Sequence, residues 1–249
     1  MDNTLLLTGA TGILGRALAR HFTSRGWRVV ATSRDPKALE ALGADAGKQL
    51  VGLAVDLRPA TAPRELLRAL DERGLCVTHL VNGARSLAGL AIGADGTTGR
   101  EAFLEEFELD VVVPYELTLA LAGSKAHRLR AVVNLGSQYG LVAPNPALYD
   151  GSLRSSPVQY GVAKAGVHHL TRELAVRLMP QGIRVNCVAF GGVEGRADAA
   201  FRARYAALTP SGRMLTASEI PGPVEFLLGE QSSAVNGQVL VADGGWTLW

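Results

Sequence analysis

Short apolar runs alternate with helical patterns along the whole chain, and this alternation restricts the possible folds more than any other feature. We predict strands at TLLLTG (4–9), WRVVATS (27–33), QLVGLAV (49–55), VTHLVN (77–82), RAVVNLG (130–136), IRVNCVA (183–189) and GQVLVA (237–242). We predict helices at 13–26, after Asp35-Pro36, and at 62–74, 99–123, 158–179 and 217–229. Apolar strands that alternate with helices form a parallel sheet that is covered on both faces. The sequence therefore predicts a doubly wound α/β fold.

Composition and charge exclude several classes of protein. The chain has 249 residues, 47% of them hydrophobic and 19% charged, and no linker divides it, so we expect a single domain over 1–249. The net charge is only +2, so we expect no nucleic-acid partner and no membrane partner. The N-terminal apolar stretch is too short for a signal peptide and no segment is long enough to span a membrane, which predicts a cytoplasmic protein.

Cysteine and histidine offer no pattern that is typical of a metal site. Cys76 and Cys187 lie in apolar runs, so we predict two buried, reduced thiols. His168 and His169 are neighbours on a predicted helix and would point about 100° apart, which does not suit two ligands of one metal ion. We predict no metal.

A glycine-rich turn, TGATGILG (8–15), lies between the first predicted strand and the first predicted helix. Glycines at this position permit a tight bend, the approach of backbone N–H groups to a pyrophosphate, and close packing of the helix on the sheet. The turn predicts a Rossmann-type dinucleotide-binding sheet. The expected cofactor contacts in it are Gly9, Thr11, Gly12, Ile13 and Leu14, with Gly15 as the packing glycine.

The residues after the second predicted strand favour NADP(H) over NAD(H). A carboxylate at the end of this strand would bind the adenosine ribose of NAD, but Ser33 and Arg34 occupy that point. Arg34 is suited to a 2′-phosphate and to stacking on adenine. Asp35 is the rival ribose acceptor, although a cap for the helix that begins at Pro36 already accounts for it.

Seven motifs occur in one order: TGATGILG (8–15), VDL (55–57), LVNGA (80–84), VVNLGS (132–137), YGVAK (160–164), RVNCVAFGGV (184–193) and VADGG (241–245). With these motifs the chain resembles the short-chain dehydrogenase/reductase family, in its compact single-domain branch, although the glycine spacing resembles the longer branch that modifies nucleotide sugars. The resemblance implies catalysis by Ser137, Tyr160 and Lys164. It implies further cofactor contacts from Asp56, Leu57, Asn82, Gly83, Ala84, Gly191 and Val193.

The resemblance also implies a homotetramer or homodimer, with the last strand and the DGGWTLW tail at an interface. Trp246 and Trp249, near the chain end, agree with burial against a partner.

Tyr160 and Lys164 are four residues apart on a predicted helix and therefore share one face. A phenol ordinarily loses its proton only near pH ~10, and a nearby ammonium stabilises the phenolate. Small neighbours such as Gly161 and Ala163 leave room for a flat ring. We expect Tyr160 to exchange a proton with a carbonyl or alcohol, with Ser137 bonded to the same oxygen.

The chain departs from the family pattern at four positions. Asp110 stands where an asparagine usually supports a proton relay near the lysine, and it could accept the same hydrogen bond or slow that relay. Arg85 replaces a glycine, either as a surface contact or as an anion contact near the substrate. Phe190 and Gly195 replace a proline and a threonine, which suggests altered packing of the nicotinamide.

Two loops are expected near the site. The stretch 138–157 is rich in turn residues, and both of its ends lie at the catalytic residues, so it must lie over the site. Within it Tyr149, Asp150 and Arg154 could bind a polar substrate; the alternative is a loop that packs on a neighbouring subunit. The stretch 190–215 shows no strand pattern and is expected to be a mobile flap.

The sequence thus predicts an NADP(H)-dependent oxidoreductase that interconverts a secondary alcohol and a ketone, on a polar, sugar-like substrate. The long loop with VVNLGSQYG resembles reductases of surface-polysaccharide or sialic-acid-like sugar modification. Two alternatives stay open: a 3-ketoacyl or small-ketone reductase, and a non-catalytic NADP(H)-binding regulator.

Overall fold

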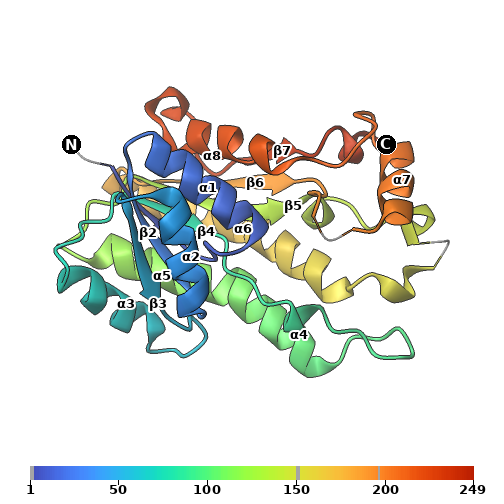
Figure 1. Ribbon diagram of the computed structural model, residues 1–249, viewed down its shortest axis with the longest axis horizontal. Helices are drawn as coiled ribbons and strands as arrows, with labels where there is room; N and C mark the ends of the chain where they lie inside the picture. Colours follow the sequence, from blue (N-terminus) through green and yellow to red (C-terminus); the bar gives the residue numbers. More distant parts are fainter. Residues whose placement is uncertain (1–2, 150–151, 196) are drawn as a thin grey trace.

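The computed structural model describes residues 3–149, 152–195 and 197–249. Its centre is a seven-stranded sheet in the order β3-β2-β1-β4-β5-β6-β7, in which every neighbouring pair is parallel (Figure 1). The strands are β1 (Thr4–Leu7), β2 (Arg28–Ser33), β3 (Leu50–Ala54), β4 (His79–Asn82), β5 (Ala131–Ser137), β6 (Arg184–Phe190) and β7 (Val239–Ala242). All seven predicted strands are confirmed.

Helices cover both faces of the sheet (Figure 1). The α-helices are α1 (Ile13–Ser24), α2 (Pro36–Ala46), α3 (Ala62–Asp71), α4 (Arg100–Phe107), α5 (Val113–Gly123), α6 (Val158–Leu178), α7 (Ala199–Leu208) and α8 (Pro221–Leu228). Short 3₁₀ turns are η1 (Ala88–Leu90), η3 (Gln138–Gly140), η4 (Pro146–Tyr149), η5 (Leu153–Ser155), η6 (Met179–Gln181), η7 (Ala217–Glu219), η8 (Glu230–Ser232) and η9 (Trp246–Leu248). In the described residues no helix is both long and apolar enough to cross a membrane.

Alternation along β1 divides the core into two layers. Leu5 and Leu7 belong to the cluster that α1, α2 and α8 cover, whereas Leu6 belongs to the cluster of α3, α5 and α6. Because successive side chains of a strand point to opposite faces of the sheet, an entirely apolar strand must be covered by other elements on both faces. The predicted doubly wound sheet is confirmed.

The long helix predicted over 99–123 contains a change of winding. α4 is followed by one π-helical turn, η2 (Glu108–Val112), and then by α5. A π-turn inserts an extra residue into a helix and often marks a functional site. Here the turn carries Asp110, which is 4% exposed.

The stretch 190–215, which the sequence predicts to be a mobile flap without a strand, contains the helix α7. The side chain of Asp198 caps α7 by accepting the N–H of Phe201 at 2.7 Å. Tyr205 of α7 stacks on Trp246, with ring centroids 4.5 Å apart. Trp246 is 5% exposed within its own chain, so its burial does not require the partner that the sequence analysis expected; Trp249 is 77% exposed.

Candidate active site

One large cavity, of about 1050 Å³, lies at the carboxyl ends of the strands. Its lining comes from the segments that follow β1, β2, β3, β4, β5 and β6, and from α6 and α7. The sheet order reverses between β1 and β4, and in open α/β sheets ligands bind at such a reversal. The position and size of the cavity suit an extended ligand.

The glycine turn is shaped by backbone contacts. Gly9 has φ +69°, and a Cβ atom there would collide with the carbonyl of Gly83, which follows the neighbouring strand β4. A Cβ atom on Gly15 would collide with the Gly9 carbonyl, which explains the close packing of α1 on the turn. Gly12 is the N-cap of α1, and no side chain of the described part of the chain caps this helix. The first N–H groups of α1 are therefore available to an anion such as a pyrophosphate.

The end of the cavity where the sequence analysis expects the adenosine carries Ser33, Arg34 and Asp56. Asp35 also lines it, but its Oδ1 accepts the N–H groups of Lys37 and Ala38 at 2.9 and 3.2 Å, in the capping role that the sequence favours. The Ser33 and Thr11 hydroxyl oxygens are 3.0 Å apart. The structure thus brings together the groups that the sequence analysis assigned to the cofactor, and Oδ1 of the carboxylate nearest to the end of β2 is engaged in capping α2.

Arg58 is a residue that sequence reasoning missed. Its guanidinium donates to both carboxylate oxygens of Asp56, with Nη2 2.6 Å from Oδ2. These hydrogen bonds hold the pKa of Asp56 below its ordinary value. The i,i+2 spacing after a strand gives no recognisable signal for such a pair.

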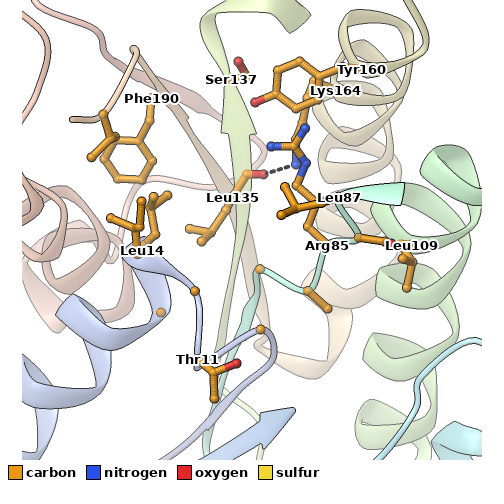
Figure 2. Close-up of a pocket in the computed structure, with 18 of the residues that line it drawn as sticks. Thr11, Leu14, Arg85, Leu87, Leu109, Leu135, Ser137, Tyr160, Lys164 and Phe190 are labelled. Atoms are coloured by element: carbon orange, nitrogen blue, oxygen red, sulfur yellow. Dashed lines mark hydrogen bonds between the residues drawn. The ribbon is translucent and has the colours of Figure 1, made fainter. Parts of the chain in front are cut away.

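Ser137, Tyr160 and Lys164 meet at the other end of the same cavity (Figure 2). Ser137 ends β5, while Tyr160 and Lys164 lie one turn apart on α6. Ser137 Oγ accepts the Tyr139 N–H at 3.2 Å, so its own hydrogen is free to be donated to a ligand. The predicted catalytic trio is brought together.

Lys164 is held by Asp110. Its Nζ donates to Asp110 Oδ1 at 2.8 Å and to the Leu135 carbonyl at 2.9 Å. Burial alone would lower the pKa of Lys164, but the charge and hydrogen bond of Asp110 together with the neighbouring Tyr160 outweigh it, so this pKa lies above its ordinary value. Lys164 is therefore an ammonium ion, and one of its three N–H groups has neither of these partners.

Arg85 lies on the face of Tyr160, with its Cζ 4.2 Å from the ring centroid. Its Nε donates to Glu106 Oε1 at 3.3 Å, and Glu106 is 1% exposed. Burial raises the pKa of the Glu106 carboxyl. Glu106 was missed, although it precedes Asp110 by four residues in the predicted long helix, and that spacing would have placed both carboxyls on one face.

The remaining predicted residues divide into those inside the cavity and those outside it. Tyr149 lines it, whereas Arg154 does not: the Arg154 side chain packs on Gly96 instead. Asp150 lies outside the described residues. Inside the cavity are also Ile13, Leu14, Leu57, Gly83, Ala84, Phe190, Gly191 and Val193.

Asn82 was assigned to the cofactor, and the structure places its side chain elsewhere. It is buried in the sheet, where Nδ2 donates to Asn134 Oδ1 at 2.8 Å. The alternation along β4 turns this side chain into the protein, so the segment contacts the cavity through the next residues, Gly83 and Ala84. Gly195, at φ +137°, lies against Ile13 of α1.

Comparison with known proteins identifies the family. The family model described as enoyl-(acyl carrier protein) reductase matches residues 9–247. The chain is a short-chain dehydrogenase/reductase. It is 33% identical, over 97% of its length, to an uncharacterized short-chain type dehydrogenase/reductase of Sinorhizobium fredii, and spans 43% of that relative.

Two further comparisons agree with this assignment. The galactitol 2-dehydrogenase (L-tagatose-forming) of Cereibacter sphaeroides is 30% identical over 98% of this chain and 94% of its own. A solved short-chain dehydrogenase of Leptospira borgpetersenii with bound NAD+ superimposes with a TM-score of 0.83, at 27% identity, over 99% of this chain and 93% of that one. As a short-chain dehydrogenase/reductase, this chain is an oxidoreductase that acts on CH–OH groups with a nicotinamide cofactor.

Proposed function

We propose that this short-chain dehydrogenase/reductase interconverts a secondary alcohol and a ketone with NADP(H), and that Tyr160 is its acid/base. One observation carries the proposal: Ser137, Tyr160 and Lys164 line the same cavity as the glycine turn of β1 and α1. A dinucleotide laid along this cavity would have its phosphates at the turn and its reacting ring at the hydroxyl groups.

Side chains of this protein would donate and accept the proton, and a bound nicotinamide would supply or accept the hydride. Ser137 donates its free hydrogen to the substrate oxygen and so holds that oxygen beside Tyr160. During reduction Tyr160 gives its proton to this oxygen, and during oxidation it takes the proton back. Lys164, kept charged by Asp110, stabilises the phenolate that remains after the proton leaves.

The preference for NADP(H) rests on the adenosine end. Arg34 and Ser33 line the cavity beside the end of β2, and Asp35 is engaged in capping α2. A guanidinium and a hydroxyl are suited to a 2′-phosphate, whereas Asp35, the rival acceptor for the ribose hydroxyls of NAD, already uses its Oδ1 to cap α2. The Leptospira structure contains NAD+, so the two cofactors must be compared directly.

A polar substrate agrees with the hydroxyl groups of Tyr139 and Tyr149, which are 3.5 Å apart and line the catalytic end. It also agrees with the sugar alcohol named for the relative in Cereibacter sphaeroides. We propose in addition that the protein is a homodimer or homotetramer. Apolar side chains on α4, α5 and α6 support this, since Leu104, Phe107, Tyr115, Val158 and Val162 are all at least 39% exposed.

The experiment is a steady-state assay of the purified protein with secondary alcohols and ketones, run with NADP(H) and with NAD(H). We expect turnover, and a kcat/KM at least about 10-fold higher with the phosphorylated cofactor. Arg34→Ala should remove most of that preference, whereas Arg73→Ala, an exposed arginine bonded to its own helix, should leave it unchanged. A protein that binds either dinucleotide and turns over nothing would contradict the proposal.

A further inference from the structure

The catalytic end of the cavity contains one cation whose hydrogen-bonding capacity is largely unused. Among the described residues that line this end, the charged side chains are Lys164 and Arg85. Lys164 is buried and paired with Asp110 at 2.8 Å. Arg85 is 30% exposed, and its only hydrogen bond to the described residues is the one from Nε to Glu106. Its Nη1 and Nη2 groups, four N–H donors, remain for a ligand.

The guanidinium of Arg85 is held in place from two sides. Glu106 anchors the Nε side and is itself buried against Gly89, where any Cβ atom would meet its carboxylate. The Tyr160 ring supports the flat face at 4.2 Å. Figure 2 shows the Arg85 side chain beside the Tyr160 ring, with Phe190 and Leu14 across the cavity. An arginine that is already oriented binds a planar anion with a small loss of conformational entropy.

The surroundings of Arg85 select for an anion. The other side chains that line this end are apolar, aromatic or uncharged: Leu87, Tyr139, Tyr149, Phe190, Phe201 and Tyr205. In the described part of the chain, the carboxylates of this region, Glu106 and Asp110, lie behind the cations that pair with them. A ligand that excludes water without bonding Arg85 would leave the Nη1 and Nη2 groups of its guanidinium without an acceptor, which is costly.

We propose that Arg85 binds a carboxylate of the substrate, so that the substrate is a compact hydroxy acid, oxidised to the keto acid. This rests on the proposed function and names its substrate class. The guanidinium lies over the ring whose hydroxyl takes the proton, so the carboxylate and the reacting carbon are only a few bonds apart. Glu106 is a positioning residue that acts through Arg85.

The test compares small secondary-alcohol acids, such as 3-hydroxybutyrate and gluconate, each with its neutral primary amide. We expect the best acid to have a kcat/KM about 100-fold above that of its amide, mainly through KM, because a charge-assisted pair is lost in the amide. Arg85→Met should reduce this ratio to near unity, Arg85→Lys should restore part of it, and Glu106→Gln should give an intermediate value. Arg73→Met is the matched control and should keep the full ratio.

The failures of the two proposals are distinguishable. Turnover of neutral alcohols with no preference for acids, or equal losses for acid and amide in Arg85→Met, would overturn the carboxylate subsite and leave the oxidoreductase intact. If no member of the panel is turned over, calorimetric titration of the NADP+-loaded protein with the same acids and amides decides the subsite. Tighter binding of acids that Arg85→Met abolishes would support it, and equal binding would overturn it. Arg85→Lys covers the case in which the methionine variant does not fold.

Discussion

At the glycine turn of the cavity the functional atoms belong to the backbone, whereas at the catalytic end they belong to side chains from distant elements. The glycine turn spans 8–15 and works through φ +69° at Gly9 and the uncapped start of α1. The catalytic end joins Arg85, Asp110, Ser137 and Lys164 from four separate segments. A substitution in the glycine turn should therefore change the shape of the site. A substitution at the catalytic end should change the charge of the site or its proton transfer.

The largest expected effect is at the catalytic end. Tyr160→Phe removes the hydroxyl that we propose exchanges the proton, and general acid–base catalysis contributes about 10²–10⁴-fold. We expect kcat to fall by about 1000-fold while the dinucleotide still binds with nearly its original Kd. Tyr115→Phe, at an exposed tyrosine of α5 outside the cavity, is the control and should keep full activity. A Tyr160→Phe enzyme with more than a tenth of the original kcat would refute the assignment.

The charge pair of the catalytic end should be the next most sensitive point. Asp110→Ala leaves the Lys164 ammonium buried without its carboxylate, and breaking a buried pair costs about 3 kcal/mol of unfolding free energy. Asp110→Asn keeps an acceptor at the same place and should cost about 1 kcal/mol. Urea unfolding at pH 7 measures both. Equal losses for the two variants would show that charge compensation is not what Asp110 provides.

The backbone end can be tested with two glycines of similar conformation. Gly9 has φ +69° and Gly26 has φ +78°, but a Cβ atom on Gly9 would collide with Gly83, whereas on Gly26 it would meet no described atom within 4 Å. Gly26→Ala should cost only the strain of a left-handed residue, about 1 kcal/mol of stability. Gly9→Ala should cost about 1–2 kcal/mol more and weaken dinucleotide binding at least about 10-fold. Equal effects of both variants on the dinucleotide Kd would contradict this account of the turn.

The smallest expected effect concerns acid stability, to which buried histidines such as His79 and His168 contribute. Burial lowers the pKa of His79, on β4, and of His168, on α6, to about 4, with the Lys164 charge adding to the effect at His168. These pKa values lie below the unfolded value of about 6.5. The contribution of the two neutral histidines to the free energy of unfolding is therefore fully present above pH 6.5 and is lost as the pH drops toward 4.

The free energy of unfolding decreases when the pH is lowered from 7.5 to 4.5, and His168→Met should make this decrease smaller by about 1–2 kcal/mol. The part of the decrease that His79 causes should remain. The free energy of unfolding at the two pH values measures it. An unchanged difference between the two pH values would show that His168 does not titrate between the folded and unfolded states.

Several features could be predicted because they depend on neighbours in the chain. The strands and the position of α1 follow from apolar runs and the glycine turn, and the pairing of Tyr160 with Lys164 follows from helical spacing. The helix α7 was not predicted within 190–215 because it has no clear amphipathic pattern: its buried face is largely Tyr205, which packs on Trp246 from the chain end. The burial of the Asn82 side chain against Asn134 was not predicted, because one step along a strand reverses the direction of a side chain.

The amino-acid sequence by itself determined the parallel sheet, the glycine turn before α1 and the shared helix face of Tyr160 and Lys164. In these, periodicity and short spacing set the geometry. Only the tertiary structure decided that Arg85 lies on the Tyr160 ring and is anchored by Glu106. It also decided that Arg58 forms an ion pair with Asp56, and that Tyr149 rather than Arg154 faces the cavity. Such pairings join separate segments, and they form only where packing brings two side chains within a few ångströms and excludes water from between them.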